Sequence, residues 1–293
     1  MDLTPPRVDL HAHTLASDGG DTPEALVAGA ARAGLELLAV TDHDTVEGVG
    51  AAVEAGARLG VDVLPGCEIT SRVLGRAVHL LAYGAGLLAP GALDRVRAAR
   101  RDLAEREHRT LIGHVTADAF ERYLSDQRPA YVAAPSLPLS GAVELVHDLG
   151  GVALLAHPGR LAPAEREGVV AEAIAAGVDG LEVWHPEHHP AEQRHWLAAV
   201  RRHGLLATGG SDHHGVHNPT VRLGGVAVPQ QAATELEELL ARRAIVAGAD
   251  QQAEWRTVVS AAAGTNSRRS ESLRGMTMAT PSAGDHASGM NRY

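Results

Sequence analysis

The sequence predicts an α/β barrel, and three observations carry that prediction. The chain has 293 residues, and one barrel domain routinely uses about 200–250. Short aliphatic runs alternate with longer amphipathic stretches, which is typical of βαβ units. About eight such runs can be distinguished, and this number favours a barrel over an open sheet.

The predicted strands are short and continuously apolar, as expected for strands that are buried on both faces of a parallel sheet. They cover residues 8–14, 36–44, 61–69, 77–84, 151–160, 178–186, 204–214 and 222–229. No G-x-G-x-x-G sequence follows the first of them, so a dinucleotide site is not expected.

The first predicted helix, at residues 22–34, has clear boundary signals. Thr22 is a good N-cap residue, Pro23 suits the first helical position, and Gly34 suits the C-terminal end. Further helices are predicted at 45–59, 90–108, 140–149, 163–176, 190–203 and 231–243.

Two segments interrupt the alternation. We expect the barrel domain to cover residues 1–250 and to carry a short helical insertion on its rim at about 86–140, which contains an arginine-rich helix. Residues 251–293 are polar, rich in Ser, Gly and Arg, and without periodicity. This composition predicts a disordered tail.

The charge balance excludes several classes of function. All 26 basic residues are arginine, against 36 acidic residues and a net charge of −10, so we expect no broad contact with duplex nucleic acid or membranes. The absence of lysine excludes a Schiff base, a pyridoxal phosphate anchor, a P-loop and a carbamylated metal bridge. One cysteine, Cys67, and the lack of a signal peptide or an apolar membrane span predict a cytoplasmic location.

The chain contains 17 histidines, and several of them fall at the ends of predicted strands, where a barrel's active site lies. Histidine is the commonest metal ligand, and carboxylates accompany the histidines at these ends. A site of imidazole and carboxylate without thiolate suits catalytic Mn, Fe or Zn. The residues that this pattern indicates are His11, His13, His43, Glu68, His157, Asp212 and His214.

Five motifs occur in a fixed order: HxH, TDHDT, G-x-E-I, AHPGR and GSDxHG. Together they resemble the PHP (polymerase and histidinol phosphatase) family of metal-dependent phosphoesterases over residues 8–229. The resemblance implies a distorted (β/α)7 TIM-like barrel and three divalent ions, expected first to be Mn²⁺, with Zn²⁺ or Fe²⁺ as alternatives. It assigns the first ion to His11, His13, Glu68 and Asp212, the second to Glu68, His79 and His157, and the third to Asp18, His43 and His214.

Within that family, the spacing resembles 3′,5′-nucleoside bisphosphate phosphatases and a 5′–3′ exoribonuclease. The resemblance implies a hydrolase that uses a metal-activated hydroxide on a phosphate monoester of a small nucleotide-like metabolite or a short oligonucleotide. We expect Glu68, Asp212 and Arg160 to be catalytic, with Arg160 also binding phosphate through its bidentate guanidinium. The alternatives are a histidinol-phosphatase-type enzyme and a non-catalytic PHP regulatory module.

Several other residues receive no catalytic role. Cys67, beside Glu68, is interpreted as a buried thiol instead of a nucleophile. Loop histidines are solvated by default, and this interpretation is applied to His185, His188, His189 and His217. His213 stands where the family usually has an aromatic or aliphatic residue. The oligomeric state is left open.

Overall fold

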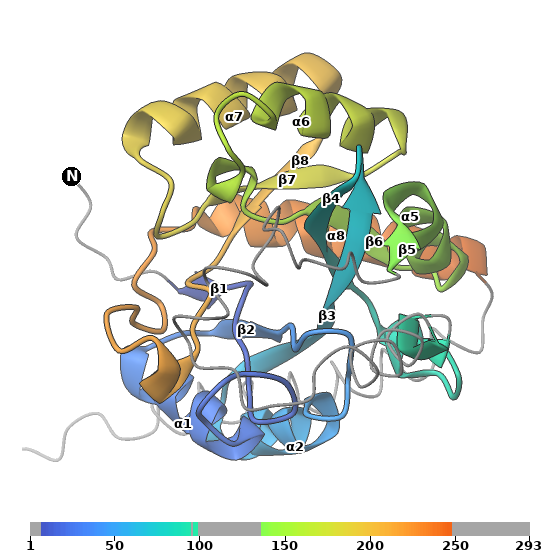
Figure 1. Ribbon diagram of the computed structural model, residues 1–293. Helices are drawn as coiled ribbons and strands as arrows, with labels where there is room; N and C mark the ends of the chain where they lie inside the picture. Colours follow the sequence, from blue (N-terminus) through green and yellow to red (C-terminus); the bar gives the residue numbers. More distant parts are fainter. Residues whose placement is uncertain (1–6, 95, 99–135, 248–293) are drawn as a thin grey trace, which may run out of the picture.

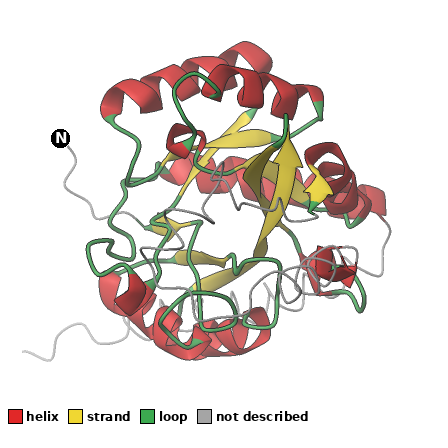
Figure 2. Cartoon of the chain, in the orientation of Figure 1, coloured by secondary structure: helices red, strands yellow, loops and turns green. Residues whose placement is uncertain are grey.

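The computed structural model describes residues 7–94, 96–98 and 136–247 (Figure 1). Strands occupy the interior and helices surround them (Figure 2), which confirms the predicted α/β class. The expected disordered tail and most of the expected rim insertion lie outside the described residues.

Eight strands form one sheet with the order β1-β2-β3-β4-β6-β7-β8, and the short β5 pairs with β3 outside this path. Their bounds are Val8–Asp9 (β1), Leu37–Val40 (β2), Asp62–Val73 (β3), Arg76–Tyr83 (β4), Leu137–Pro138 (β5), Val152–Leu155 (β6), Gly180–Trp184 (β7) and Leu206–Gly209 (β8).

The alternation predicted a parallel sheet, and this prediction is wrong at one strand. β4 runs antiparallel to both β3 and β6, whereas the other neighbours along the path are parallel. The reason is a two-residue hairpin turn at Leu74 and Gly75, whose φ angles are +50° and +75°. Two successive positive φ angles produce the tight turn that joins antiparallel strands.

The two ends of the strand path approach each other without a continuous ladder among the described residues. Beyond β1 and β8 the chain forms a parallel bridge between Ala12 and His213. The Asp212 amide donates to the His11 carbonyl at 2.9 Å, and the His13 amide donates to the His213 carbonyl at 3.0 Å. The arrangement is consistent with the expected distorted barrel.

The eighth predicted strand, at 222–229, is wrong. The chain there makes a turn, with Gly224 at a φ of +67°. The Gly224 amide donates to the Asp9 carboxylate at 2.8 Å, so a side chain satisfies a group that a strand would present to its neighbour.

The helices lie close to their predicted positions. Thr22 caps α1 by accepting a hydrogen bond from the Ala25 amide, and Gly34 ends the helix with a φ of +77°, as expected. The α-helices are Pro23–Ala33 (α1), Val49–Leu59 (α2), Leu139–Asp148 (α5), Arg166–Ala175 (α6), Pro190–His203 (α7) and Gln230–Ala247 (α8). Short 3₁₀ turns cover Ala85–Leu88 (η1), Pro158–Arg160 (η3) and Gly215–His217 (η4).

Alternate residues of a strand belong to different apolar clusters, because they point to opposite faces of the sheet. One cluster joins inward residues such as Leu37, Ala39, Leu81 and Tyr83 to apolar residues of α8. A second packs the sheet against α5, α6 and α7, and a third packs it against α1 and α2. The helices therefore pack closely against the sheet, which helps its strand ends hold polar groups in place.

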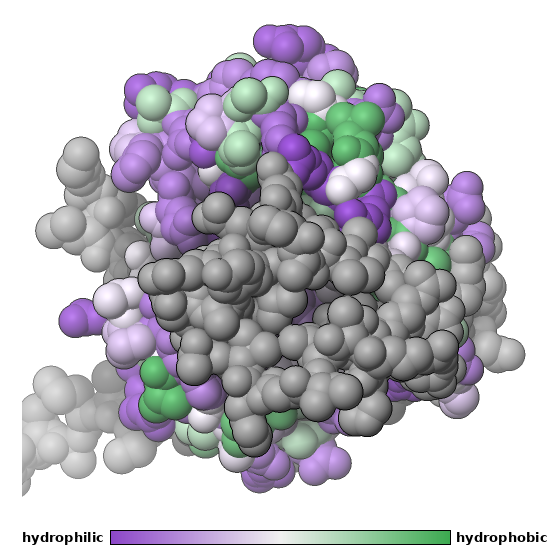
Figure 3. Space-filling model, in the orientation of Figure 1, coloured by the Kyte–Doolittle hydropathy of each residue, from purple (hydrophilic) through white to green (hydrophobic). Residues whose placement is uncertain are grey.

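The described surface is mixed in character. Among the coloured residues in Figure 3, hydrophilic ones predominate and apolar ones form small areas. Across the described segments, no helix combines the length and the apolar character that a membrane crossing requires.

Candidate metal centre

One end of the barrel, called the mouth here, collects the residues singled out in the sequence. A cavity of about 560 Å³ opens there, called the metal-site cavity. Seven of the nine predicted ligands line it: Asp18, His43, Glu68, His79, His157, Asp212 and His214. The other two, His11 and His13, are fully buried, and their side chains contact Glu68 and Asp212.

His79 lies near the start of its strand, yet it reaches the mouth. The antiparallel direction of β4 explains this, because the beginning of β4 lies beside the end of β3. His79 Nδ1 lies 2.9 Å from Glu68 Oε1. Only the family resemblance indicated His79, and the strand direction supplies its structural reason.

Glu68 stands at the centre of the site, with each carboxylate oxygen facing different histidines. Oε2 lies 3.0 Å from His11 Nε2 and 3.2 Å from His13 Nε2. Oε1 lies 2.9 Å from both His79 Nδ1 and His157 Nε2. The side chain itself is 1% exposed. This geometry is that of a carboxylate able to serve two cations at once.

Asp212 completes the first predicted set. Its Oδ1 lies 3.3 Å from His11 Nε2 and 3.1 Å from His13 Nε2. The ligand atoms of His11, His13, Glu68 and Asp212 lie within 4.8 Å of one another, as a shared cation requires. The structure thus brings together the four residues of that set.

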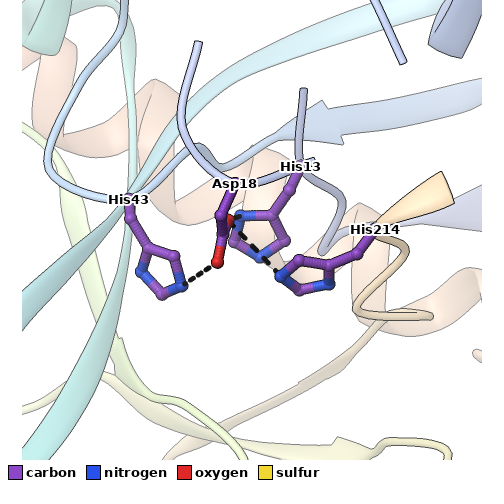
Figure 4. A group of neighbouring side chains, drawn as sticks. All are labelled: His13, Asp18, His43 and His214. Carbon is purple, nitrogen blue, oxygen red and sulfur yellow. Dashed lines mark ion pairs between the residues drawn. The ribbon is translucent and has the colours of Figure 1, made fainter. Parts of the chain in front are cut away.

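A second group surrounds the exposed side chain of Asp18 (Figure 4). Asp18 Oδ1 is 3.4 Å from His214 Nε2 and 3.6 Å from His13 Nδ1, and Oδ2 is 3.7 Å from His43 Nε2. His13 therefore joins the predicted trio of Asp18, His43 and His214 in this group.

The third group differs in one member from the predicted second set. His43, Glu68 and His79 have ligand atoms within 4.8 Å of one another. His157, the expected partner, instead approaches the same Glu68 oxygen as His79 and lies with its ring centre 5.4 Å from that of His79.

The donor set fits divalent cations. Glu182 Oε1 accepts a hydrogen bond from His11 Nδ1 at 2.9 Å, so in the neutral ring Nε2 carries a lone pair. That lone pair faces carboxylate oxygens of Glu68 and Asp212. Acceptors facing acceptors in a buried site need a proton or a metal ion between them.

In the absence of metal, protons bind at these positions, as the pKa values of the buried histidines indicate. Burial lowers the pKa of His13, but hydrogen bonds to Asp212 and Glu68 outweigh burial and raise it to about 9. Burial also lowers the pKa of His11, but the charges of Glu182, Glu68 and Asp212 outweigh burial and raise this pKa well above its usual value. Protons therefore occupy places that a metal ion would take.

The pKa values of the carboxylates at the site are shifted in the opposite direction, below their usual values. Burial raises the pKa of Glu68, yet His11, His79 and His43 hold it well below its usual value. The pKa of Asp212 is also held far below its usual value, despite burial, by His11 and by hydrogen bonds from neighbouring histidines. Both remain ionised at neutral pH, as metal ligands must be.

Glu182 is a site residue that sequence reasoning missed. It is completely buried in β7, and its Oε2 accepts the His157 amide at 2.8 Å while Oε1 holds His11. A register shift between Glu182 and Trp184 marks a β-bulge beside it, a common feature near active sites. A carboxylate inside an apolar strand was the signal that could have revealed it.

The aspartates on either side of His43 hold neighbouring segments. Asp42 accepts the Thr14 amide at 2.7 Å and the Ser17 hydroxyl at 2.7 Å, which positions the turn that carries Asp18. Asp44 accepts the Thr70 amide at 2.7 Å. The TDHDT motif thus presents one histidine and fixes the backbone around it.

Arg160 lies at the mouth and lines the metal-site cavity. Its Nη1 lies 3.2 Å from Asp212 Oδ2 and its Nε lies 3.4 Å from Glu187 Oε1, with the side chain 46% exposed. The ion pair that competed with a phosphate contact is therefore present. It directs the guanidinium along the cavity wall while part of it faces solvent.

The default interpretation of the loop histidines is wrong for two of them. His185 and His188 are buried, whereas His189 and His217 are exposed. His185 Nε2 lies 3.3 Å from Asp212 Oδ2, and its Nδ1 accepts the Glu187 amide. Both rings pack under the mouth because the loop after β7 folds inward.

Two further residues have defined surroundings. His213, half-buried, pairs with Asp21 at 3.1 Å. Cys67 is buried, as expected, and burial followed by neighbouring carboxylates raises the pKa of its thiol well above the usual value. A thiol in this state is a poor nucleophile.

Two of the predicted ligands have unusual backbone angles. The φ of His157 is +24° and that of Asp212 is +53°. Non-glycine residues rarely adopt positive φ, and such strain concentrates at functional sites. Both side chains enter the mouth directly after a strand ends.

Comparison with known proteins agrees with this geometry. The model of the PHP domain matches residues 9–136. A phosphoribosyl 1,2-cyclic phosphate 1,2-diphosphodiesterase of Eggerthella lenta is 32% identical over 71% of this chain and 94% of the relative. A 3′,5′-nucleoside bisphosphate phosphatase of Chromobacterium violaceum is 32% identical over 71% and 87%. A 5′-3′ exoribonuclease of Escherichia coli is 32% identical over 70% and 84%.

Two solved structures have the same fold. A candidate metal-dependent phosphoesterase of Bifidobacterium adolescentis superposes with a TM-score of 0.68 and 30% identity, over 80% of this chain and 98% of that one. An amidohydrolase of Chromobacterium violaceum with bound sulfate and no metal superposes with a TM-score of 0.61 and 29% identity, over 80% of this chain and 96% of that one. With relatives matched over nearly their whole length and with its His, Asp and Glu clusters, the chain belongs to the PHP-domain family of metal-dependent phosphoesterases.

Proposed function

We propose that this protein hydrolyses a phosphate monoester of a small nucleotide-like substrate, as a 3′,5′-nucleoside bisphosphate phosphatase does. The observation that carries the proposal is Glu68, whose two oxygens face separate histidines at a cavity that also contains Arg160. The relatives named above act on a nucleoside bisphosphate, a cyclic phosphate or RNA. The Chromobacterium structure binds sulfate, a tetrahedral dianion like phosphate.

Three divalent ions, Mn²⁺ first, form part of the proposal. The first is assigned to His11, His13, Glu68 and Asp212, the second to Glu68, His79 and His157, and the third to Asp18, His43 and His214. When bound, such ions activate water for attack on phosphorus and offset the charge of the phosphoryl oxygens.

In the proposed reaction, a water oxygen bonds to phosphorus, the ester P–O bond breaks, and the alcohol leaves with a proton. Arg160 binds phosphoryl oxygens through its planar guanidinium. The contact from Asp212 Oδ2 keeps that group facing the cavity. Glu68 and Asp212, both ionised and nearly enclosed, would hold the cations in place.

The first test is a substrate panel with Mn²⁺-loaded protein. It compares nucleoside 3′,5′-bisphosphates, mononucleotides, a ribose cyclic phosphate, short RNA and histidinol phosphate by release of inorganic phosphate or cleavage products. We expect two to three bound ions per chain and fastest turnover of a nucleotide monoester. Preferred cleavage of the cyclic phosphate or RNA would reject monoester specificity. No turnover of any ester would favour the regulatory module.

Arg160→Ala tests the phosphate contact. We expect kcat/KM to fall by roughly 10- to 100-fold, the size of losing a charge-assisted pair worth about 1.5–3 kcal/mol. Arg160→Lys should restore activity only in part, since an ammonium group cannot make the bidentate contact. The matched control is Arg194→Ala, at an exposed position of α7. Unchanged kinetics for Arg160→Ala on every substrate would exclude the role.

A further inference from the structure

A second cavity, called the side cavity, lies beside the metal-site cavity. Its volume is about 470 Å³, within the range of about 300–1,000 Å³ typical of small-molecule sites. The start of β4, the end of β6 and the loop after η3 form its walls. Because β4 is antiparallel, its first residues lie at the mouth, so the side cavity opens next to the reacting groups.

The two cavities share a wall of three residues. His79, His157 and Arg160 line both, whereas Asp18, His43, Asp212 and His214 line only the metal-site cavity. A molecule with its phosphate at Arg160 therefore has one end among ligand residues and can extend its other end into the side cavity.

The two cavities differ in chemical character. Nearly every residue around the metal-site cavity is ionisable. The side cavity is lined mainly by apolar residues: Ala77, Val78, Leu155, Ala156, Leu161 and Ala162. Apart from Arg160 and the predicted ligands His79 and His157, its ionisable groups are Arg76 and Glu165, which neutralise each other in an ion pair. Such walls favour an uncharged organic group over a second phosphate.

The wall that carries Arg160 and Leu161 is held rigidly. His188 Nδ1 donates to the Val183 carbonyl at 2.9 Å, so Nε2 accepts the Gly159 amide at 2.9 Å. Arg166 donates to the Leu161 carbonyl at 2.7 Å and to the Gly159 carbonyl. A Cβ at Gly159 would lie 2.3 Å from His188 Cδ2, so only glycine permits this contact. A preorganised wall lowers the entropy cost of binding.

We propose that the side cavity binds the nucleoside part of the leaving alcohol, while the phosphate that is hydrolysed lies in the metal-site cavity. The proposal rests on the nucleotide phosphatase function proposed above. It makes the loop after η3 a determinant of substrate size, separate from the residues that hold the ions.

The test fills the side cavity at its exposed edge. Ala162→Trp places a large ring where an exposed alanine lines the cavity, and Ala164→Trp is the matched control, an exposed alanine of the same loop that does not line it. The measured quantity is the ratio of kcat/KM for 3′-AMP to kcat/KM for methyl phosphate, whose alcohol is too small to use the cavity.

We expect Ala162→Trp to lower this ratio at least tenfold and Ala164→Trp to leave it unchanged within twofold. A ratio that is unchanged by Ala162→Trp, or equally lowered by both variants, would overturn the proposal.

A binding measurement separates this proposal from the proposed function. Saturation-transfer NMR of adenosine, which has no phosphate, should show binding to the Mn²⁺-loaded protein that weakens in Ala162→Trp alone. If esters are hydrolysed but adenosine does not bind, the cavity assignment fails and the function stands. If adenosine binds in this way but no ester is hydrolysed, the function fails and the cavity assignment stands.

Discussion

Replacing Glu182 by Gln tests whether a residue outside the predicted ligand set controls metal binding. Its carboxylate is completely buried, and burial is outweighed by His11, so its pKa is lowered to about 2. One oxygen accepts from His11 Nδ1 at 2.9 Å and the other accepts from the His157 amide at 2.8 Å. A single side chain thus orients two predicted ligands, the arrangement by which a second partner fixes a metal-binding histidine.

The magnitude follows from the geometry. Glutamine keeps one oxygen acceptor, but its NH₂ group must face the other N–H donor, whichever way the amide is turned. One charge-assisted hydrogen bond is lost, at a cost of about 1.5–3 kcal/mol. This corresponds to a loss of roughly 10- to 100-fold in Mn²⁺ affinity, the range found for such partners of metal ligands.

Isothermal titration of metal-free protein with Mn²⁺ measures the affinity directly, and circular dichroism checks folding. We expect high Mn²⁺ to restore much of the turnover, because the ligands themselves remain. Glu172→Gln, at an exposed position of α6, is the matched control. A folded Glu182→Gln protein with wild-type Mn²⁺ affinity would refute the positioning role.

Three further predictions concern other parts of the chain. Glu68→Gln should abolish turnover and reduce the bound Mn²⁺ measured by elemental analysis by at least one ion, because its carboxylate faces two ligand sets. In metal-free protein, the His13 pKa is raised to about 9. Its contribution to stability is therefore fully present below pH ~6.5 and lost as pH rises through about 9, so the melting temperature should fall over that window. Deleting residues 251–293, which lie outside the described residues, should change the melting temperature and turnover little.

Each of these has a contradicting outcome. Full metal content and activity in Glu68→Gln would reject the bridging assignment. A melting temperature of metal-free protein that is constant from pH 6.5 to 9, or equal pH profiles for wild type and His13→Gln, would contradict the titration argument. Unfolding or loss of turnover after truncation would show that the tail packs on the barrel.

The sequence by itself was sufficient for the fold class and for the nine predicted ligands, which the structure brings to the mouth. Local pattern explains this success. Helix α1 begins after Thr22 and ends at Gly34 as predicted, because capping depends on neighbouring residues. Apart from His79, which only the family resemblance indicated, the predicted ligands follow or end apolar runs, and strand ends converge in any barrel. Their role as ligands stays a prediction that the metal measurements test.

Only the tertiary structure decided the direction of β4, the partners of Glu182 and the burial of His188. Periodicity shows that a strand is buried, but strand direction depends on the turn at Leu74 and Gly75. His11 and Glu182 are 171 residues apart in the chain and hydrogen-bond only because the barrel brings β1 and β7 to one mouth. Such contacts arise from the packing of segments that are far apart in the chain, and no local spacing encodes them.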